Sequence, residues 1–225
     1  MKLLNIQIAL FSKDNISRPD LVLNQINESM NKIFDEMPMI MDLPEGMPTN
    51  IPIAQVASKS KEYALSVARG RVDYYINPKL FKEESITPEE AYNNYKDLIE
   101  MYCKTVNKSI DIIRIGIIFN LFQKSDNNVQ TIYNKYLKKA YSTSDKEVTV
   151  RLNKQIQLKN HIINNIIKIE AGELNISSYK EKGVFIQFDI NNVPELSKEL
   201  NCTNLNNIIR HAANKIKDAN VKELL

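Results

Sequence analysis

The sequence predicts an α+β protein, with antiparallel sheet covered by helices on one face. Runs of alternating apolar and polar residues recur along the chain, and alternation with a period of two is typical of half-buried strands. Single helical patterns separate these runs of strands, which favours antiparallel pairing. With 225 residues, of which 43% are hydrophobic and 25% charged, the chain can bury a core of its own.

The order strand, helix, three strands, helix is predicted twice. This order divides the chain into a first α+β half, residues 1–109, and a second half, residues 110–225, closely packed as one unit. We find no residue-level repeat between them, so the two β-α-β-β-β-α halves are similar in predicted topology alone.

The elements of the first half are predicted by periodicity and by turn residues. We expect strands over 2–11 and 51–58, a helix over 19–36, and a hairpin of EYALSVA and RVDYYIN. Thr87, Pro88 and Glu90 mark the start of the second helix, because they supply an N-cap, a first-turn proline and the carboxylate of a capping box. The stretch after the first helix carries Pro38, Pro44, Pro48 and Pro52, which predicts a long irregular loop.

The elements of the second half follow from the same signals. The strand SIDIIRIGIIFNLF opens it, a helix is expected over about 127–140, and strands are expected over 147–158, over 161–170 and along GVFIQFDIN. A closing helix starts at Thr203 and turns five apolar residues inward. They are Leu205, Ile208, Ile209, Ala212 and Ile216.

Three of these segments also resemble a known family. The hairpin region IPIAQVASKSKEYALSVARGRVDYYI, the strand IIRIGIIFN and the late strand GVFIQFDIN are similar, in that order, to an uncharacterised, sporadically distributed family of bacterial and phage proteins. The resemblance covers most of the chain. It implies an accessory role in bacteria or phages, for instance on mobile elements or in defence and anti-defence, and it transfers no active site.

Catalytic and metal-binding motifs are absent from the sequence. His161 and His211 have no Cys, Asp or Glu at ligand spacing, and Cys103 and Cys202 are too few for a disulfide framework and are expected to be buried thiols. No glycine-rich phosphate loop, GxSxG or HExxH string occurs. We therefore predict no catalytic residue, no metal and no cofactor, and the chemistry favours a binding protein over an enzyme.

Charge and hydropathy constrain the partner and the location. A net charge of +3, with Lys and Glu interspersed, gives weak attraction to nucleic acid, so a nucleic-acid-binding module is the least favoured reading. No window approaches the roughly 18 uninterrupted apolar residues of a membrane span, and the first residues lack the features of a signal peptide. We expect a cytoplasmic protein without membrane association, and a homo-oligomer is compatible with the sequence.

Strand alternation predicts a polar face on the side of the sheet opposite the core. The residues expected there are Asn5, Gln7, Ser66, Asp73, Tyr75, Arg114, Asn120, Arg151, Gln187 and Asp189. Of these we take Arg114, Asp73, Tyr75, Asn120, Gln187 and Asp189 as candidate binding residues. Two alternatives stay open, a solvated face with structural ion pairs and a binding surface.

Arg114 is the sharpest member of this set. Its guanidinium lies among isoleucines, so it needs a carboxylate, backbone carbonyls or an anionic ligand. Asp73 and Asp189 are the carboxylates that the pattern places nearest. A small anionic, nucleotide-like ligand is therefore the second reading of the function.

The loop after the first helix carries four of the seven methionines: Met37, Met39, Met41 and Met47. Flexible thioether side chains adapt to irregular apolar surfaces, so the loop is either a docking patch or a cover over one end of the first helix. The leading reading is a non-enzymatic protein that binds another protein through this loop or through the polar sheet face.

Overall fold

The structure is a computed structural model that describes residues 1–42, 44, 46–78, 87–137, 146–176, 179–195, 199–217, 220–221 and 223–224. Within these residues, nine strands form one sheet in the order β2-β3-β4-β5-β1-β6-β9-β8-β7. Every pair of neighbouring strands is antiparallel. The predicted α+β class is therefore confirmed.

The described elements have the following bounds. The strands are β1 (Lys2–Ser12), β2 (Met39–Ile40), β3 (Pro52–Ala57), β4 (Tyr63–Ala68), β5 (Arg71–Ile76), β6 (Ile112–Lys124), β7 (Thr149–Leu158), β8 (His161–Ile176) and β9 (Tyr179–Asn192). The helices are α1 (Pro19–Ser29), α2 (Pro88–Asn93), α3 (Lys96–Ser109), α4 (Asn128–Ile132), which continues as a π-helical turn (Tyr133–Leu137), and α5 (Cys202–Lys215).

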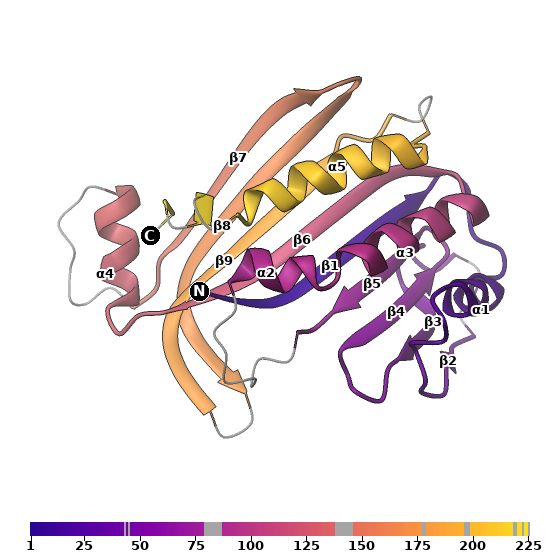
Figure 1. Cartoon of the computed structure of the whole chain (residues 1–225), viewed down its shortest axis with the longest axis horizontal. Helices are drawn as coiled ribbons and strands as arrows, with labels where there is room; N and C mark the ends of the chain where they lie inside the picture. The colour runs from indigo at the N-terminus through magenta and orange to yellow at the C-terminus, as the bar shows by residue number, and fades with distance from the viewer. Residues whose placement is uncertain are drawn as a thin grey trace.

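Helices cover one face of the sheet. Figure 1 shows α2, α3 and α5 in front of the central strands, and α3 contacts both α1 and α5. Helix α1 packs against β3 and β4, whereas α4 lies at the far end of the sheet against β8 and β9. We call the opposite side of the sheet the open face.

The core lies between the sheet and these helices because both present apolar stripes to it. Ile6, Ile8 and Leu10 of β1 are fully buried, as alternation requires for one face of a strand. Burying an aliphatic side chain of this size contributes about 1.5–3 kcal/mol, which makes such stripes the main source of stability.

Strands β1 and β6 pair along their length at the centre of the sheet. From this pair the sheet extends outward through β5, β4 and β3 on one side and through β9, β8 and β7 on the other. The boundary drawn between residues 109 and 110 falls at the end of α3. Because β1 and β6 are hydrogen-bonded neighbours, both parts of the chain share one sheet.

The first helix is shorter than predicted. It ends at Ser29 because Asn31 and Lys32 adopt left-handed backbone angles, with φ of 57° and 55°. The Asn27 side chain then bonds the backbone of Phe34, donating to its carbonyl and accepting from its N–H at 3.0 and 3.2 Å. This local network turns the chain back, so Phe34 is buried although it lies beyond the end of the helix.

The second predicted helix is split into α2 and α3. Its start is confirmed, since Thr87 and Glu90 form a reciprocal capping box with bonds of 2.8 and 3.2 Å. At the junction Tyr95 has φ of −112° and ψ of −3°, and its hydroxyl donates to Glu62 at 2.7 Å. That long-range bond fixes the junction between the two helices.

Smaller differences concern the remaining elements. The proline-rich loop contains one two-residue strand, β2, which pairs with β3. Plain alternation from Ile6 predicts that Leu4 faces the core, but a register shift between Leu3 and Asn5 turns Leu3 into the core instead. The predicted helix over 127–140 is α4 with its π-helical turn, and its residues 138–140 lie outside the described part of the chain.

Candidate binding surface on the open face of the sheet

The register of the sheet aligns one residue from each strand in a single row across the open face. Residues directly opposite in an antiparallel pair point to the same face, so the row can be followed from strand to strand. From β2 to β7 it contains Met39, Gln55, Ser66, Asp73, Ala9, Gly116, Asn191, Asn164 and Gln155. We call this set the cross-sheet row, and most of its side chains are small or neutral and polar.

The six sequence-predicted residues all lie on the open face, in three neighbouring rows and at one rim. Asp73 belongs to the cross-sheet row itself. Tyr75 and Asp189 lie in the next row, together with Gln7 and Ile118, while Asn120 and Gln187 are direct neighbours in the row beyond. Arg114 lies at the rim, opposite Phe11.

Side-chain amides on this face bond to one another in chains. Gln187 donates to Asn120 at 2.9 Å, and Asn120 donates to Asn5 at 2.6 Å. A second chain starts at Gln155 and runs through Asn164 and Asn191, with bonds of 2.9 and 3.0 Å, before Asn191 donates to Asp189 at 2.9 Å. Each amide in a chain keeps a further donor or acceptor for another group.

Asp73 is the centre of a buried ion pair. It is 1% exposed, accepts from Arg71 Nε at 2.7 Å and from Gln7 at 3.0 Å, and Gln7 also donates to the hydroxyl of Tyr75 at 3.3 Å. Burial raises the pKa of the Asp73 carboxyl, and Arg71 opposes that shift. Burial also raises the pKa of Tyr75, which stays a neutral phenol at physiological pH.

Arg114 does not pair with either of the predicted carboxylates. Both oxygens of Asp73 are taken by Arg71 and Gln7, and Asp189 accepts from Asn191. The Arg114 guanidinium instead lies over the ring of Phe11, with its carbon 5.0 Å from the ring centroid. The reason is strand order, since β1 separates β5 from β6 and places Phe11 between Arg71 and Arg114.

One hollow on the open face joins the two surfaces that the sequence proposed separately. It has a volume of about 300 Å³, and Met37 and Met39 line it together with Ser66 and Tyr75. Met37 is 92% exposed and Met39 56% exposed, so neither covers the core. The Ser66 hydroxyl is buried and has no hydrogen-bond partner among the described residues. We call this the methionine hollow.

The other two loop methionines contribute less. Met47 is 41% exposed, and Met41 is partly buried, with its backbone N–H bonded to the carbonyl of Ile53. Neither of them lines the methionine hollow.

A second hollow of about 270 Å³ opens farther along the open face. Asn120 and Gln187 line it, together with Asn5 and the charged pair Lys168 and Glu170. Since the amide chain through Asn120 crosses this hollow, its walls offer neutral hydrogen-bonding groups rather than a net charge.

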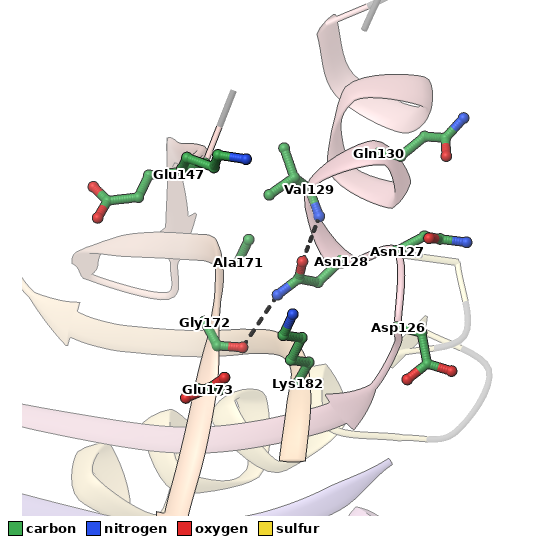
Figure 2. Close-up of a pocket in the computed structure, with 11 residues that line it drawn as sticks. Asp126, Asn127, Asn128, Val129, Gln130, Glu147, Ala171, Gly172, Glu173 and Lys182 are labelled. Atoms are coloured by element: carbon green, nitrogen blue, oxygen red, sulfur yellow. Dashed lines mark hydrogen bonds between the residues drawn. The ribbon is translucent and has the colours of Figure 1, made fainter. Parts of the chain in front are cut away.

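A larger cavity, of about 610 Å³, lies beside α4 (Figure 2). Its central side chain is Asn128, which donates to the carbonyls of Gly172 and Gly183 at 3.1 Å and accepts from the N–H of Val129 at 2.9 Å. The two bonds to the glycine carbonyls tie α4 to the sheet. Because its amide is fully used for structure, Asn128 has little left for a ligand there.

Sequence reasoning missed part of the open face. Gln55, Ala9, Gly116, Asn164 and Asn191 all belong to the cross-sheet row, but none was a candidate. The alternation signal would have placed Gln55 and Asn191 on the correct face. The small residues Ala9 and Gly116 carry no such signal. In the structure, an added Cβ at Gly116 would meet no other heavy atom within 4 Å.

The described residues contain no group of His, Cys, Asp or Glu that could hold a metal ion. His211 bonds Asn165 at 2.7 Å, while Cys103 is buried and Cys202 is exposed, so the prediction of two buried thiols is wrong for Cys202. Cys202 begins α5, where its thiol donates to Asn107 rather than packing inward.

Two further findings come from the whole described chain and from comparison with known proteins. Among the helices of the described residues, none is both long and apolar enough to cross a membrane. No protein-family model matches the chain, and no curated protein matches it either.

Proposed function

We propose that this protein binds an extended segment of another protein along the cross-sheet row and catalyses no reaction. The observation that carries the proposal is the methionine hollow, where two exposed methionines meet a buried serine hydroxyl that has no partner among the described residues. Leaving a polar atom without a partner is costly, and a group bound in the hollow that Ser66 lines could supply the missing hydrogen bond. A peptide can satisfy both features, because it offers an apolar side chain to the methionines and a polar backbone group to the serine hydroxyl.

The amide chains support a polypeptide as the partner. Peptide groups are neutral and carry one donor and one acceptor each. They can therefore pair with the donors and acceptors that the Asn and Gln side chains leave unused. The hollow that Asn120 and Gln187 line lies along the same face. Such a surface can follow a backbone while the methionines adapt to different side chains.

A small anionic ligand is the second candidate, and Arg114 is the observation that favours it. Its guanidinium has no carboxylate partner among the described residues. None of the three cavities described above includes Arg114, however, so an enclosed site for such a ligand lacks support. Nucleic acid fits less well, since the cross-sheet row contains a carboxylate and no cation.

The setting that we propose is the bacterial cytoplasm, in an accessory role on a mobile element or in defence and anti-defence. It rests on the resemblance of the strand segments to the bacterial and phage family.

The experiment is selection of binding octapeptides from a random displayed library, followed by fluorescence anisotropy with the selected peptides. We expect the double variant Met37→Ser and Met39→Ser to weaken binding about tenfold, because burial of two thioether side chains is lost. Ser66→Ala should weaken binding without lowering the melting temperature.

The matched control is Leu21→Ser, which removes an exposed apolar side chain from α1 on the helix side. Failure of the wild type to select any peptide would sink the proposal. Equal losses in the methionine variant and in Leu21→Ser would place the binding site elsewhere.

A further inference from the structure

Two arginines flank one phenylalanine at the rim of the open face. Phe11 is directly opposite Arg71 on β5 and Arg114 on β6, and the two guanidinium carbons lie 5.7 and 5.0 Å from its ring centroid. Stacking over an aromatic ring keeps a guanidinium in place and leaves its edge free for an anion. The phenylalanine therefore orients both cations before any ligand arrives.

The two arginines differ in what satisfies their charge. Arg71 donates from Nε to Asp73 at 2.7 Å, so its cation is neutralised within the sheet. Nε of Arg114 is buried without a hydrogen-bond partner, and no described carboxylate pairs with its guanidinium. Because Nε itself is buried and the side chain as a whole is half-buried, an anion from outside would bind the terminal nitrogens of the guanidinium and supply the charge partner that it lacks.

Arg114 lies within reach of a segment that fills the methionine hollow. Three strand spacings separate Ser66 on β4 from β6, and Arg114 is two residues along β6 from Gly116 of the cross-sheet row. With spacings of about 4.8 Å between strands and about 3.4 Å along them, the two Cα atoms are roughly 16 Å apart. About five extended residues span that distance.

The small residues Ala9 and Gly116 lie between these two points in the cross-sheet row. An added Cβ at Gly116 would meet no other heavy atom within 4 Å. Ala9 is 5% exposed and Gly116 is buried, so a segment that crosses this part of the row meets the side chains that flank it.

We propose that Arg114 binds the carboxylate of an Asp or Glu side chain in the partner segment, about five residues from the side chain that fills the methionine hollow. This inference rests on the proposed function. It adds an acidic residue to the partner segment and assigns the recognition of its carboxylate to the guanidinium of Arg114.

The test uses peptides selected by the wild-type protein from a random library of decapeptides. We expect enrichment of Asp or Glu about five positions from an apolar residue. For such a peptide, a Glu→Gln change should lower the affinity of the wild type about tenfold. Arg114→Met should lose the same factor with the Glu peptide and nothing with the Gln peptide.

Two further variants separate charge and geometry. Arg114→Lys keeps the charge but loses the planar fork, so it should recover only part of the affinity. Arg210→Met removes an equal charge from the exposed side of α5 and should bind like the wild type. Melting temperatures of all variants check that each remains folded.

The outcomes distinguish this inference from the proposed function. Selected peptides without acidic residues, or equal binding of the Glu and Gln peptides, overturn the role of Arg114 while loss of binding in the methionine variant still supports the proposed function. If the wild type selects no peptide but retains a single-stranded oligonucleotide through Arg114, both proposals fail.

Discussion

Two glycines of the sheet have opposite surroundings, and the difference predicts opposite responses to a methyl group. A Cβ at Gly183 would lie 2.3 Å from the carbonyl of Gln123 and 2.4 Å from the ring of Phe122. A Cβ at Gly116 would meet nothing within 4 Å. Only Gly183 is therefore required for close approach of its neighbours.

We expect Gly183→Ala to lower the free energy of unfolding by about 1–3 kcal/mol, because the backbone or Phe122 must move. Gly116→Ala is the control and should change it by less than about 1 kcal/mol, in either direction. Urea unfolding monitored by circular dichroism measures both. Equal destabilisation in the two variants would contradict the packing around Gly183.

His211 links α5 to β8 through a 2.7 Å bond between its Nε2 and the side-chain oxygen of Asn165. Burial lowers the pKa of His211, and the nearby charge of Lys215 lowers it further. The folded-state pKa is therefore below the unfolded value of about 6.5. The stability that this group contributes is present above pH of about 6.5 and is lost as the pH falls through the folded-state pKa.

The free energies of unfolding of the wild type and of His211→Gln should diverge between pH 7.5 and 5. The wild type should lose stability relative to the variant as the pH falls, since only the wild type must take up a proton on unfolding. Urea unfolding at each pH gives the difference, and NMR titration of the ring protons gives the pKa directly. A constant difference across this range would show that His211 is not perturbed.

At the scale of elements, α5 holds the second part of the sheet through one buried stripe. Leu205, Ile208, Ile209 and Ala212 are all at most 2% exposed, and Ile216 just beyond the helix is fully buried. The stripe follows the helical period of the sequence, and its predicted inward orientation is confirmed. The Asn201 side chain caps the helix by accepting from Asn204 at 2.9 Å.

We predict that Ile208→Ala lowers the free energy of unfolding by about 2–4 kcal/mol, through lost burial and a residual cavity. Arg210→Ala changes an exposed residue of the same helix and should alter stability by at most about 0.5 kcal/mol. Thermal and urea unfolding check both variants. If Ile208→Ala left the free energy of unfolding unchanged, α5 would contribute little to the core.

Other elements show where local patterns stop being sufficient. The apolar spacing that runs through Phe34 correctly predicts that this side chain is buried. The helix nevertheless ends at Ser29, because Asn31 and Lys32 adopt left-handed backbone angles and the chain then turns back. The break before α3 depends in the same way on a bond from Tyr95 to Glu62, far away in sequence. Periodicity reports burial, and it does not report which backbone geometry achieves it.

At the scale of the whole molecule, the sheet combines features that lie far apart in the sequence. The loop that carries Met37 and Met39 reaches the open face beside Ser66 and Tyr75, and the amide chain from Gln187 ends at Asn5 near the start of the chain. A single antiparallel sheet of nine described strands makes this convergence geometrically simple, because every register pair points to the same face.

The sequence by itself determined the α+β class, most strands, the inward stripe of α5 and the face on which most strand residues lie. These properties depend on a period of two or 3.6 residues, which neighbouring residues specify without help from the rest of the chain. The common face of Arg114, Asp73 and Asp189 is of this kind.

Only the tertiary structure decided which residues are neighbours on that face. Asp73 pairs with Arg71 and Gln7, and Arg114 stacks on Phe11, because β1 lies between β5 and β6 in one particular register. Sliding a strand by two residues would keep every side chain on its face and change every neighbour. Local patterning is insensitive to such a shift, and packing of the complete sheet against its helices selects the register that forms.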